Sequence, residues 1–216
     1  MENASHKDAK DRYYNFVKNR IILLIPEGPH VVMDLGCATG KLGRKLLSLN
    51  KAAEMVGVEI FEPAAEEAAQ YYTKVYCGDL ESLNIDYNDY FDYVICGDIL
   101  EHLRDPWKTL DRIRGWLKEG GNLIASIPNV RYWRVLADLM IFGKWNYVEA
   151  GILDNTHLRF FTRSTFLRTL ADANFDILYH AMWVSGRKKR LANTLTLGLF
   201  EEFIGSQVTV VAKKKK

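Results

Sequence analysis

Apolar runs alternate with amphipathic stretches over residues 31–127, and this alternation predicts strands and helices in turn. Short apolar runs bounded by turn residues cover residues 31–34, 53–60, 75–77, 91–96 and 122–127. Helix-like spacing of apolar residues fills three of the gaps, at residues 41–49, 63–72 and 106–118. Strands that alternate with helices indicate a parallel sheet with both faces covered. Gly120 and Gly121 are expected to turn the chain into the fifth strand.

The regular pattern ends at Pro128. Residues 129–161 are rich in aromatic and arginine side chains and lack the pattern of a sheet framework. Their aromatic residues include Tyr132, Trp133, Trp145, Tyr147, Phe160 and Phe161. Long excursions of this kind within α/β domains often carry binding or lid functions. We therefore interpret the segment as an insertion with a binding task.

Regular structure is predicted again after this insertion. Thr162 or Ser164 is expected to cap a helix that runs through Leu170. Strands are expected at residues 175–185 and 207–212, separated by a basic RKKR turn and a short helix at residues 191–203. The four lysines at residues 213–216 are expected to form a frayed basic tail.

Composition narrows the class of protein. The chain has 216 residues, of which 48% are hydrophobic and 26% charged, as in an ordinary single globular domain. A net charge of only +2 makes nucleic acid an improbable partner on bulk electrostatic grounds. Three cysteines in or beside apolar strands predict a reduced, cytoplasmic protein. The longest aliphatic run is too short for a membrane span.

The first strand leads into a glycine-bounded loop, VVMDLGCATG, with Asp34 where the strand ends. A dinucleotide fingerprint fails, because Ala38 follows Gly36 where glycine is required. A P-loop also fails, because the glycine spacing is one residue short and Leu42 follows Lys41. A carboxylate at Asp34 would repel a pyrophosphate. It suits a ligand with ammonium, sulfonium or hydroxyl groups.

This loop and three later motifs resemble the class I S-adenosylmethionine-dependent methyltransferases. The later motifs are VGVEI with Glu59, CGDL with Asp79, and FDYVICGDILEHLRDP. The resemblance covers residues 13–175 approximately, and it implies one domain over residues 1–216. The implied fold is a Rossmann-like, doubly wound, mostly parallel seven-stranded sheet with an antiparallel edge strand. Residues 129–161 would be an inserted aromatic-rich lid.

The resemblance implies a binding site for S-adenosylmethionine, with S-adenosylhomocysteine as product. The residues implied are Tyr14, Asp34, Gly36, Cys37, Gly40, Glu59, Ile60, Asp79, Leu80, Gly97 and Asp98. Tyr14 belongs to an amphipathic helix predicted over residues 7–24, within an N-terminal segment at residues 1–28 that would cover the cofactor. Asp34 would hold the amino group, Glu59 both ribose hydroxyls and Asp79 the adenine amino group.

One residue departs from the family's loop. Ala38 stands where a further glycine is common, and its Cβ restricts positive φ. We therefore expect a slightly altered loop that still binds the cofactor.

Methyl transfer from a sulfonium depends strongly on alignment, and a hydroxyl acceptor also benefits from a base. His157 and His102 are the candidate bases, each with a packing or capping role as its alternative. Arg159 would pair with an anionic acceptor group. Glu101 is interpreted as a helix-start residue. No cluster of carboxylates or histidines has ligand spacing along the chain, so no metal ion is expected.

Two segments of the insertion resemble a narrower group. IPNVRYWRVL and GILDNTHLRFFT are similar to methyltransferases found with bacterial glycosyltransferases, which suggests O-methylation of a glycan or small-molecule hydroxyl. Methylation of RNA or protein is the enzymatic alternative, with RKKR as its footprint. A non-catalytic, cofactor-binding partner subunit is a third interpretation. The protein would be a monomer or a homodimer, and the insertion would close over the methyl donor.

Overall fold

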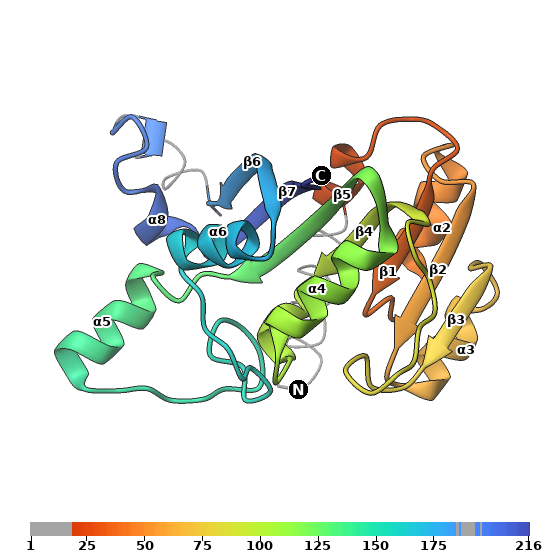
Figure 1. Cartoon of the computed structure of the whole chain (residues 1–216). Helices are drawn as coiled ribbons and strands as arrows, with labels where there is room; N and C mark the ends of the chain where they lie inside the picture. The colour runs from red at the N-terminus through yellow and green to blue at the C-terminus, as the bar shows by residue number, and fades with distance from the viewer. Residues whose placement is uncertain (1–18, 185, 187–192, 195) are drawn as a thin grey trace. The chain divides into compact units, whose positions relative to one another are not determined.

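The computed structural model describes residues 19–184, 186, 193–194 and 196–216 of the chain (Figure 1). The chain divides into two compact units. The first contains the residues up to Gly97 together with 113–124, and the second contains residues 98–112 and 125–216. Tyr14, most of the predicted first helix and the RKKR turn lie outside the described residues. The end of that helix is confirmed, because residues 19–24 are helical.

The first unit is built around four parallel strands. β1 (Val31–Leu35) pairs with β2 (Glu54–Glu59) on one side and with β4 (Phe91–Gly97) on the other. β3 (Lys74–Cys77) pairs with the outer side of β2. Val32, Met33, Val56 and Val94 are fully buried. These strands read as unbroken apolar runs because both of their faces are covered.

Helices α2 (Lys41–Ser48) and α3 (Glu62–Ala68) follow β1 and β2, and both pack against β2. α2 begins directly after Gly40, so the glycine-bounded loop connects the carboxyl end of β1 to a helix N-terminus. The helix α4 (Pro106–Trp116) and the strand β5 (Leu117–Pro128) are each divided between the two units along the chain.

The second unit begins with the short 3₁₀ helix η1 (Leu100–His102). After β5 come α5 (Trp133–Phe142), α6 (Arg163–Asp172), β6 (Phe175–Trp183), α8 (Glu201–Ile204) and β7 (Gln207–Lys214). Thr162 caps α6, because its hydroxyl accepts from the backbone of Thr165 and the reciprocal bond is also present. β6 runs antiparallel to β7.

The hydrogen-bonded strand order is β3-β2-β1-β4-β5-β7-β6. The strands β1, β2, β3 and β4 pair in parallel, whereas β6 pairs antiparallel with β7. The sheet is therefore mixed and mostly parallel. The predicted fold class is therefore confirmed. In the part of the chain that the structure describes, no helix has the length and apolar character needed to cross a bilayer.

Three local predictions were wrong. β5 begins at Leu117, so the glycine pair lies within the strand and Gly120 bends it with φ 77°. In the described part of residues 191–203, the expected helix is interrupted: residues 193–194 are helical, residues 196–200 form turns, and α8 starts at Glu201. The lysine tail is not frayed at Lys213 and Lys214, which pair with β6 because Asp176 and Phe175 continue the ladder.

Candidate functional site

The loop after β1 is tied to the neighbouring strand by its backbone. The N–H groups of Gly36 and Cys37 both donate to the carbonyl oxygen of Val58, at 2.8 and 3.0 Å. Gly40 adopts φ 74°, and a Cβ there would lie 2.9 Å from the Cα of Ala68. Only glycine meets both demands. The loop backbone is thus fixed at the carboxyl edge of the sheet, where α/β folds bind ligands.

Ala38 takes the left-handed conformation despite its Cβ, with φ 46°. Its N–H donates a 2.8 Å hydrogen bond to Oε2 of Glu59. A non-glycine residue in this region costs roughly 1–2 kcal/mol, and a hydrogen bond to a charged group can offset that cost. Ala38 therefore adopts the positive φ that its Cβ disfavours, and cofactor binding by this loop stays a prediction.

Asp34 is 4% exposed, and its Oδ2 accepts a 2.7 Å hydrogen bond from the phenol of Tyr72. The same phenol oxygen accepts from the backbone N–H of Gly43 in α2, at 3.2 Å. Burial, and then the nearby Asp34 carboxylate, raise the pKa of Tyr72 well above its usual value. The phenol therefore keeps its proton and donates a hydrogen bond to Asp34. The sequence shows no signal for this contact, because it depends on tertiary packing.

Glu59 lies at the end of β2 and uses both carboxylate oxygens toward backbone donors. Oε2 accepts from Ala38, and Oε1 accepts from the N–H of Phe61 at 2.9 Å. A carboxylate has about four acceptor positions, so these two bonds leave capacity on each oxygen. The next residue, Ile60, is 71% exposed and offers an apolar surface beside the carboxylate.

The remaining cofactor candidates of the first unit have mixed environments. Oδ1 of Asp79 accepts from the N–H of Glu81 at 2.9 Å, and Leu80 is buried. The Cys37 side chain is buried against β2, where Gly57 leaves room for its Sγ. Only the backbone of Cys37 is therefore suited to a ligand. Gly97 is the last residue of β4.

Asp98, the first residue of the second unit, is held within that unit. Its Oδ1 accepts from the hydroxyl of Ser126 at 3.1 Å and from Nε2 of Gln207 at 2.7 Å. Asp98 itself has φ 56°, an uncommon value for a residue with a side chain. These bonds connect the start of the second unit to β5 and β7. The predicted contact of Asp98 with the cofactor is untested.

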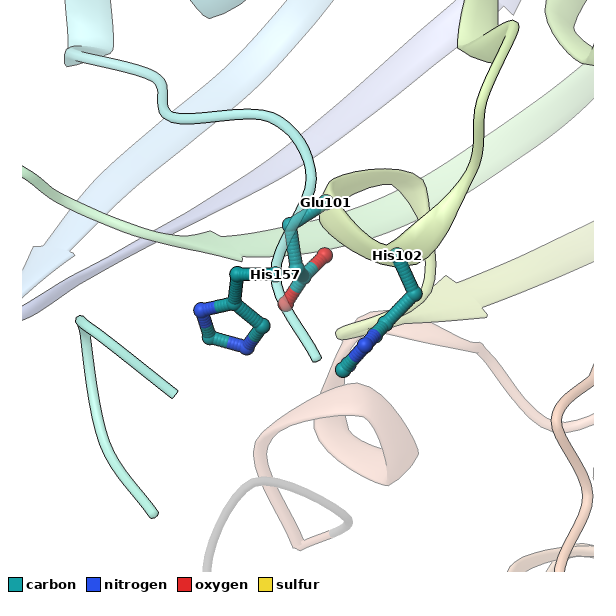
Figure 2. Close-up of side chains that lie close together, drawn as sticks. All are labelled: Glu101, His102 and His157. Carbon is teal, nitrogen blue, oxygen red and sulfur yellow. The ribbon is translucent and has the colours of Figure 1, made fainter. Parts of the chain in front are cut away.

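The second unit brings the two candidate histidines together. The N–H groups of Leu158 and Arg159 both donate to the carbonyl oxygen of Glu101, at 2.8 and 2.9 Å. This main-chain contact holds the segment that carries His157 beside η1, which carries His102 (Figure 2). The two imidazole rings meet edge to face, with centroids 4.7 Å apart.

Hydrogen bonds indicate the tautomer of each imidazole. Nδ1 of His157 lies 2.9 Å from the carbonyl oxygen of Ile152, and Nδ1 of His102 lies 3.2 Å from that of Thr156. A carbonyl can only accept, so each Nδ1 carries the proton. In a neutral ring, Nε2 then carries the lone pair that a base or a ligand would use.

Asp154 reinforces this arrangement through Thr156. Its Oδ1 accepts from the backbone N–H and the hydroxyl of Thr156, at 2.9 and 2.7 Å. Burial by itself would raise the pKa of Asp154, but the bonds from Thr156 and the charges of His157 and His102 outweigh it and lower the pKa. Asp154 therefore stays ionised close to the two histidines.

Glu101 is the residue that the sequence interpretation undervalued. It is 1% exposed, and neither of its carboxylate oxygens has a hydrogen-bond partner among the described residues. Burial first, and then the charges of Asp98 and Asp154, raise its pKa well above the usual range. The adjacent GluHis pair in DILEHL was visible in the sequence, but the burial of the carboxylate was not.

Glu101, His102 and His157 form a cluster in which one ligand atom from each residue lies within 4.8 Å of the others (Figure 2). We had expected no such cluster, because residues of metal-ligand type are not closely spaced along the chain. That premise is wrong, since tertiary structure joins two distant segments.

Arg159 is partly engaged within the second unit. Its Nη2 donates to the carbonyl oxygen of Arg104, and its guanidinium lies over the ring of Trp107, 5.3 Å from the centroid. The predicted contact with an anionic acceptor group is untested. The structure adds a second task, which is to hold the chain after η1.

The aromatic insertion contains a pocket of about 700 Å³. It is lined by charged and polar groups together with apolar ones: Tyr132, Arg134, Asp138, Lys144, Asn146 and Ser206, with Val135, Val148, Ala150, Ile152 and Leu153. Ile152 is also the residue whose carbonyl receives Nδ1 of His157. A bond through the backbone therefore connects one wall of the pocket to the histidine pair.

Known proteins resemble the chain in sequence and in fold. A family model described as a methyltransferase domain matches residues 9–180. The ubiquinone biosynthesis O-methyltransferase of Coxiella burnetii is 30% identical over 120 residues, which are 53% of this chain and 48% of that protein. The chain thus spans about half the length of that curated relative.

Two solved structures show the same fold. An S-adenosylmethionine-dependent methyltransferase from Archaeoglobus fulgidus matches with a TM-score of 0.66 and 21% identity, covering 93% of this chain and 94% of that one. A second such enzyme, from Mesorhizobium loti, matches with a TM-score of 0.65 and 18% identity, covering 92% and 98%.

Proposed function

This chain belongs to the methyltransferase family whose domain matches its residues 9–180, and we propose that it methylates a hydroxyl group of a small molecule or glycan. S-Adenosylmethionine is the methyl donor. The observation that carries the proposal is the loop after β1, fixed at the carboxyl edge of the sheet and hydrogen-bonded to Glu59. The O-methyltransferase name of the Coxiella relative supports a hydroxyl acceptor.

The donor would be bound by the first unit. Glu59 keeps acceptor capacity on both oxygens, which suits the two ribose hydroxyls. Asp34 is buried and bonded to Tyr72, so it would reach the amino group through water or the loop backbone. Backbone atoms of Gly36, Cys37 and Gly40 would approach the methionine portion. Asp79 would accept from the adenine amino group.

The acceptor would be bound by the second unit, in the pocket of the aromatic insertion. A volume of about 700 Å³ is within the usual range for small-molecule sites. Arg134, Lys144 and Asp138 give the lining both signs of charge, and Tyr132 adds an aromatic face. This mixture supports a polar acceptor such as a sugar over a wholly apolar one. Closure of the insertion over the methyl donor stays a prediction.

The reaction needs the acceptor oxygen to lose a proton as it attacks the methyl carbon. The carbon–sulfur bond breaks, and S-adenosylhomocysteine leaves as a neutral thioether. In the ion-free protein we assign the proton to Nε2 of His157, which is 8% exposed and oriented by Ile152. His102 is the alternative base, oriented by Thr156. Arg159 would orient an anionic group of the acceptor.

Release of S-adenosylhomocysteine in the presence of different acceptors tests this function. The panel contains free and nucleotide-linked sugars, phenols, RNA and protein. We expect release with hydroxyl-bearing small molecules and none with RNA or protein. Release only with RNA or protein would replace the proposal by the enzymatic alternative. Cofactor binding without release in any mixture would favour a non-catalytic subunit.

A further inference from the structure

The cluster of Glu101, His102 and His157 lies wholly within the second unit and has the composition of a metal site. Each residue offers one ligand atom, and these atoms lie within 4.8 Å of one another. Ligand atoms at roughly 2.0–2.2 Å from one tetrahedral ion lie about 3.4 Å apart. Small side-chain rotations that draw the three atoms closer together would therefore complete the coordination.

The carboxylate of Glu101 needs a partner that the described residues do not supply. Both of its oxygens are buried without a hydrogen bond. Native proteins rarely leave such a group unpaired, because removing it from water without compensation costs several kcal/mol. A cation among Glu101 and the two imidazoles would satisfy both oxygens at once.

The surroundings of the histidines have the pattern that supports metal ligands. A ligating histidine typically donates its second ring N–H to a backbone carbonyl or a carboxylate, which fixes the ring. His157 donates to the carbonyl of Ile152, and His102 to that of Thr156. Thr156 is in turn held by Asp154. Each imidazole is thus held by a carbonyl in the manner of an oriented metal ligand.

We propose that Glu101, His102 and His157 bind a divalent transition-metal ion. Two imidazole nitrogens with one carboxylate suit zinc, manganese or iron, whereas magnesium prefers oxygen ligands. Asp154 accepts from the Thr156 hydroxyl, which lies 3.1 Å from Nδ1 of His102, so a further carboxylate beside the histidines favours a cation. Three protein ligands leave coordination positions open to a further molecule.

An open coordination position would allow the ion to bind the acceptor hydroxyl, and this role rests on the proposed function. A hydroxyl oxygen bound to the ion would lose its proton more readily than a free hydroxyl. The two histidines would then act as ligands, and the ion would replace His157 in activating the acceptor. The hydroxyl proton would pass to solvent, while the oxygen–methyl bond forms and the carbon–sulfur bond breaks.

Binding of Zn²⁺ and Co²⁺ to the chelator-treated full chain tests the site without any activity assay. Calorimetry should show one Zn²⁺ per chain with a dissociation constant of about 1 µM or lower. Co²⁺ should give the visible absorption of a nitrogen- and oxygen-ligated ion, without sulfur-to-metal charge transfer. Wild-type protein that takes up neither ion would overturn the proposal.

Zn²⁺ binding to single-residue variants tests whether these three residues are the ligands. Glu101→Gln, His102→Ala and His157→Ala should each weaken Zn²⁺ binding by about 100-fold or more, since each removes one ligand. His180→Ala is the matched control, because His180 is an exposed histidine on β6 of the same unit. Equal Zn²⁺ affinity in Glu101→Gln and wild type would overturn the assignment.

Calorimetry with S-adenosylmethionine on the same samples separates the two proposals. Variants that lose Zn²⁺ should retain cofactor binding, which also shows that they are folded. Cofactor binding without Zn²⁺ binding in wild type overturns only the ion site. Zn²⁺ binding without cofactor binding overturns only the proposed function.

Discussion

The phenol of Tyr72 donates a 2.7 Å hydrogen bond to Oδ2 of Asp34, which links the turn that follows α3 to the end of β1. The same oxygen accepts from the N–H of Gly43 in α2. One buried hydroxyl thus joins the acidic residue of the proposed cofactor site to the first turn of the helix that follows the loop. Asp34 is thereby held in place before any ligand arrives.

Replacing Tyr72 with phenylalanine should therefore reduce stability. The change removes one hydroxyl and leaves both Asp34 and the Gly43 N–H short of a partner. We expect the free energy of unfolding to fall by about 1–3 kcal/mol. Tyr71→Phe is the control, because the Tyr71 hydroxyl accepts a 3.4 Å bond from Arg44 at an exposed position. Equal chemical denaturation midpoints for the two variants would contradict the structural role.

The cofactor assignment predicts a loss of affinity in the variants Asp34→Ala and Glu59→Ala. Each should weaken S-adenosylmethionine binding by about 1–3 kcal/mol, because a charged hydrogen-bond partner is lost. Glu62→Ala, in the first turn of α3, is the control and should bind normally. Calorimetry provides the measurement. Unchanged affinity in Glu59→Ala would show that the ribose is bound elsewhere.

Asp92 predicts a pH-dependent contribution to stability. Burial alone would raise its pKa, but the ammonium of Lys118 and the N–H of Val31 outweigh that and lower it. A carboxyl with a lowered folded-state pKa stabilises the fold above its unfolded pKa of about 3.9. That contribution disappears as the pH falls through the lowered value.

Asp92→Asn should accordingly reduce the free energy of unfolding by about 0.5–1 kcal/mol at pH 7, a small value because the pair is partly exposed. The difference from wild type should vanish as the pH falls below about 4. Asp86→Asn, an exposed carboxyl in a loop of the same unit, should show a smaller effect at pH 7. A deficit that persists unchanged at acid pH would show that the asparagine acts through packing.

The histidine pair predicts a catalytic defect that spares the cofactor. His157→Ala should lower turnover by about 10²–10⁴-fold, with S-adenosylmethionine affinity nearly unchanged. Arg159→Ala should mainly raise the acceptor KM. Steady-state kinetics with calorimetry of the donor measures both. Full turnover in His157→Ala would show that His157 is not the base. His102 would then be the base, or alignment of donor and acceptor alone would explain catalysis.

The sequence predicted the individual strands of the parallel part of the sheet well, because each strand depends on a local pattern. Each parallel strand is a short apolar run, and the strand ends at Asp34 and Glu59 carry the side chains that matched a family. Thr162 was also predictable, since a cap acts over one turn. The start of β5 was harder to predict, because the strand runs through Gly120 despite the turn propensity of glycine.

What the sequence did not show depends on contacts between distant residues. Nothing local marks Tyr72 as the partner of Asp34, or Glu101 as a buried carboxylate. His102 and His157 were both candidates, but their 4.7 Å ring contact follows from backbone bonds to Glu101. Nor did the sequence show that the N–H of Ala38 donates to Glu59, a bond that offsets the cost of positive φ at a residue with a Cβ.

Transfer of a ¹³C-labelled methyl group from S-adenosylmethionine tests the central claim most directly. The labelled product is examined by NMR, where the carbon shift distinguishes a methyl group on oxygen from one on nitrogen or carbon. The account predicts a single labelled O-methyl group on a hydroxyl-bearing small molecule or sugar. A labelled N-methyl or C-methyl product, or no transfer to any hydroxyl acceptor despite cofactor binding, would contradict it.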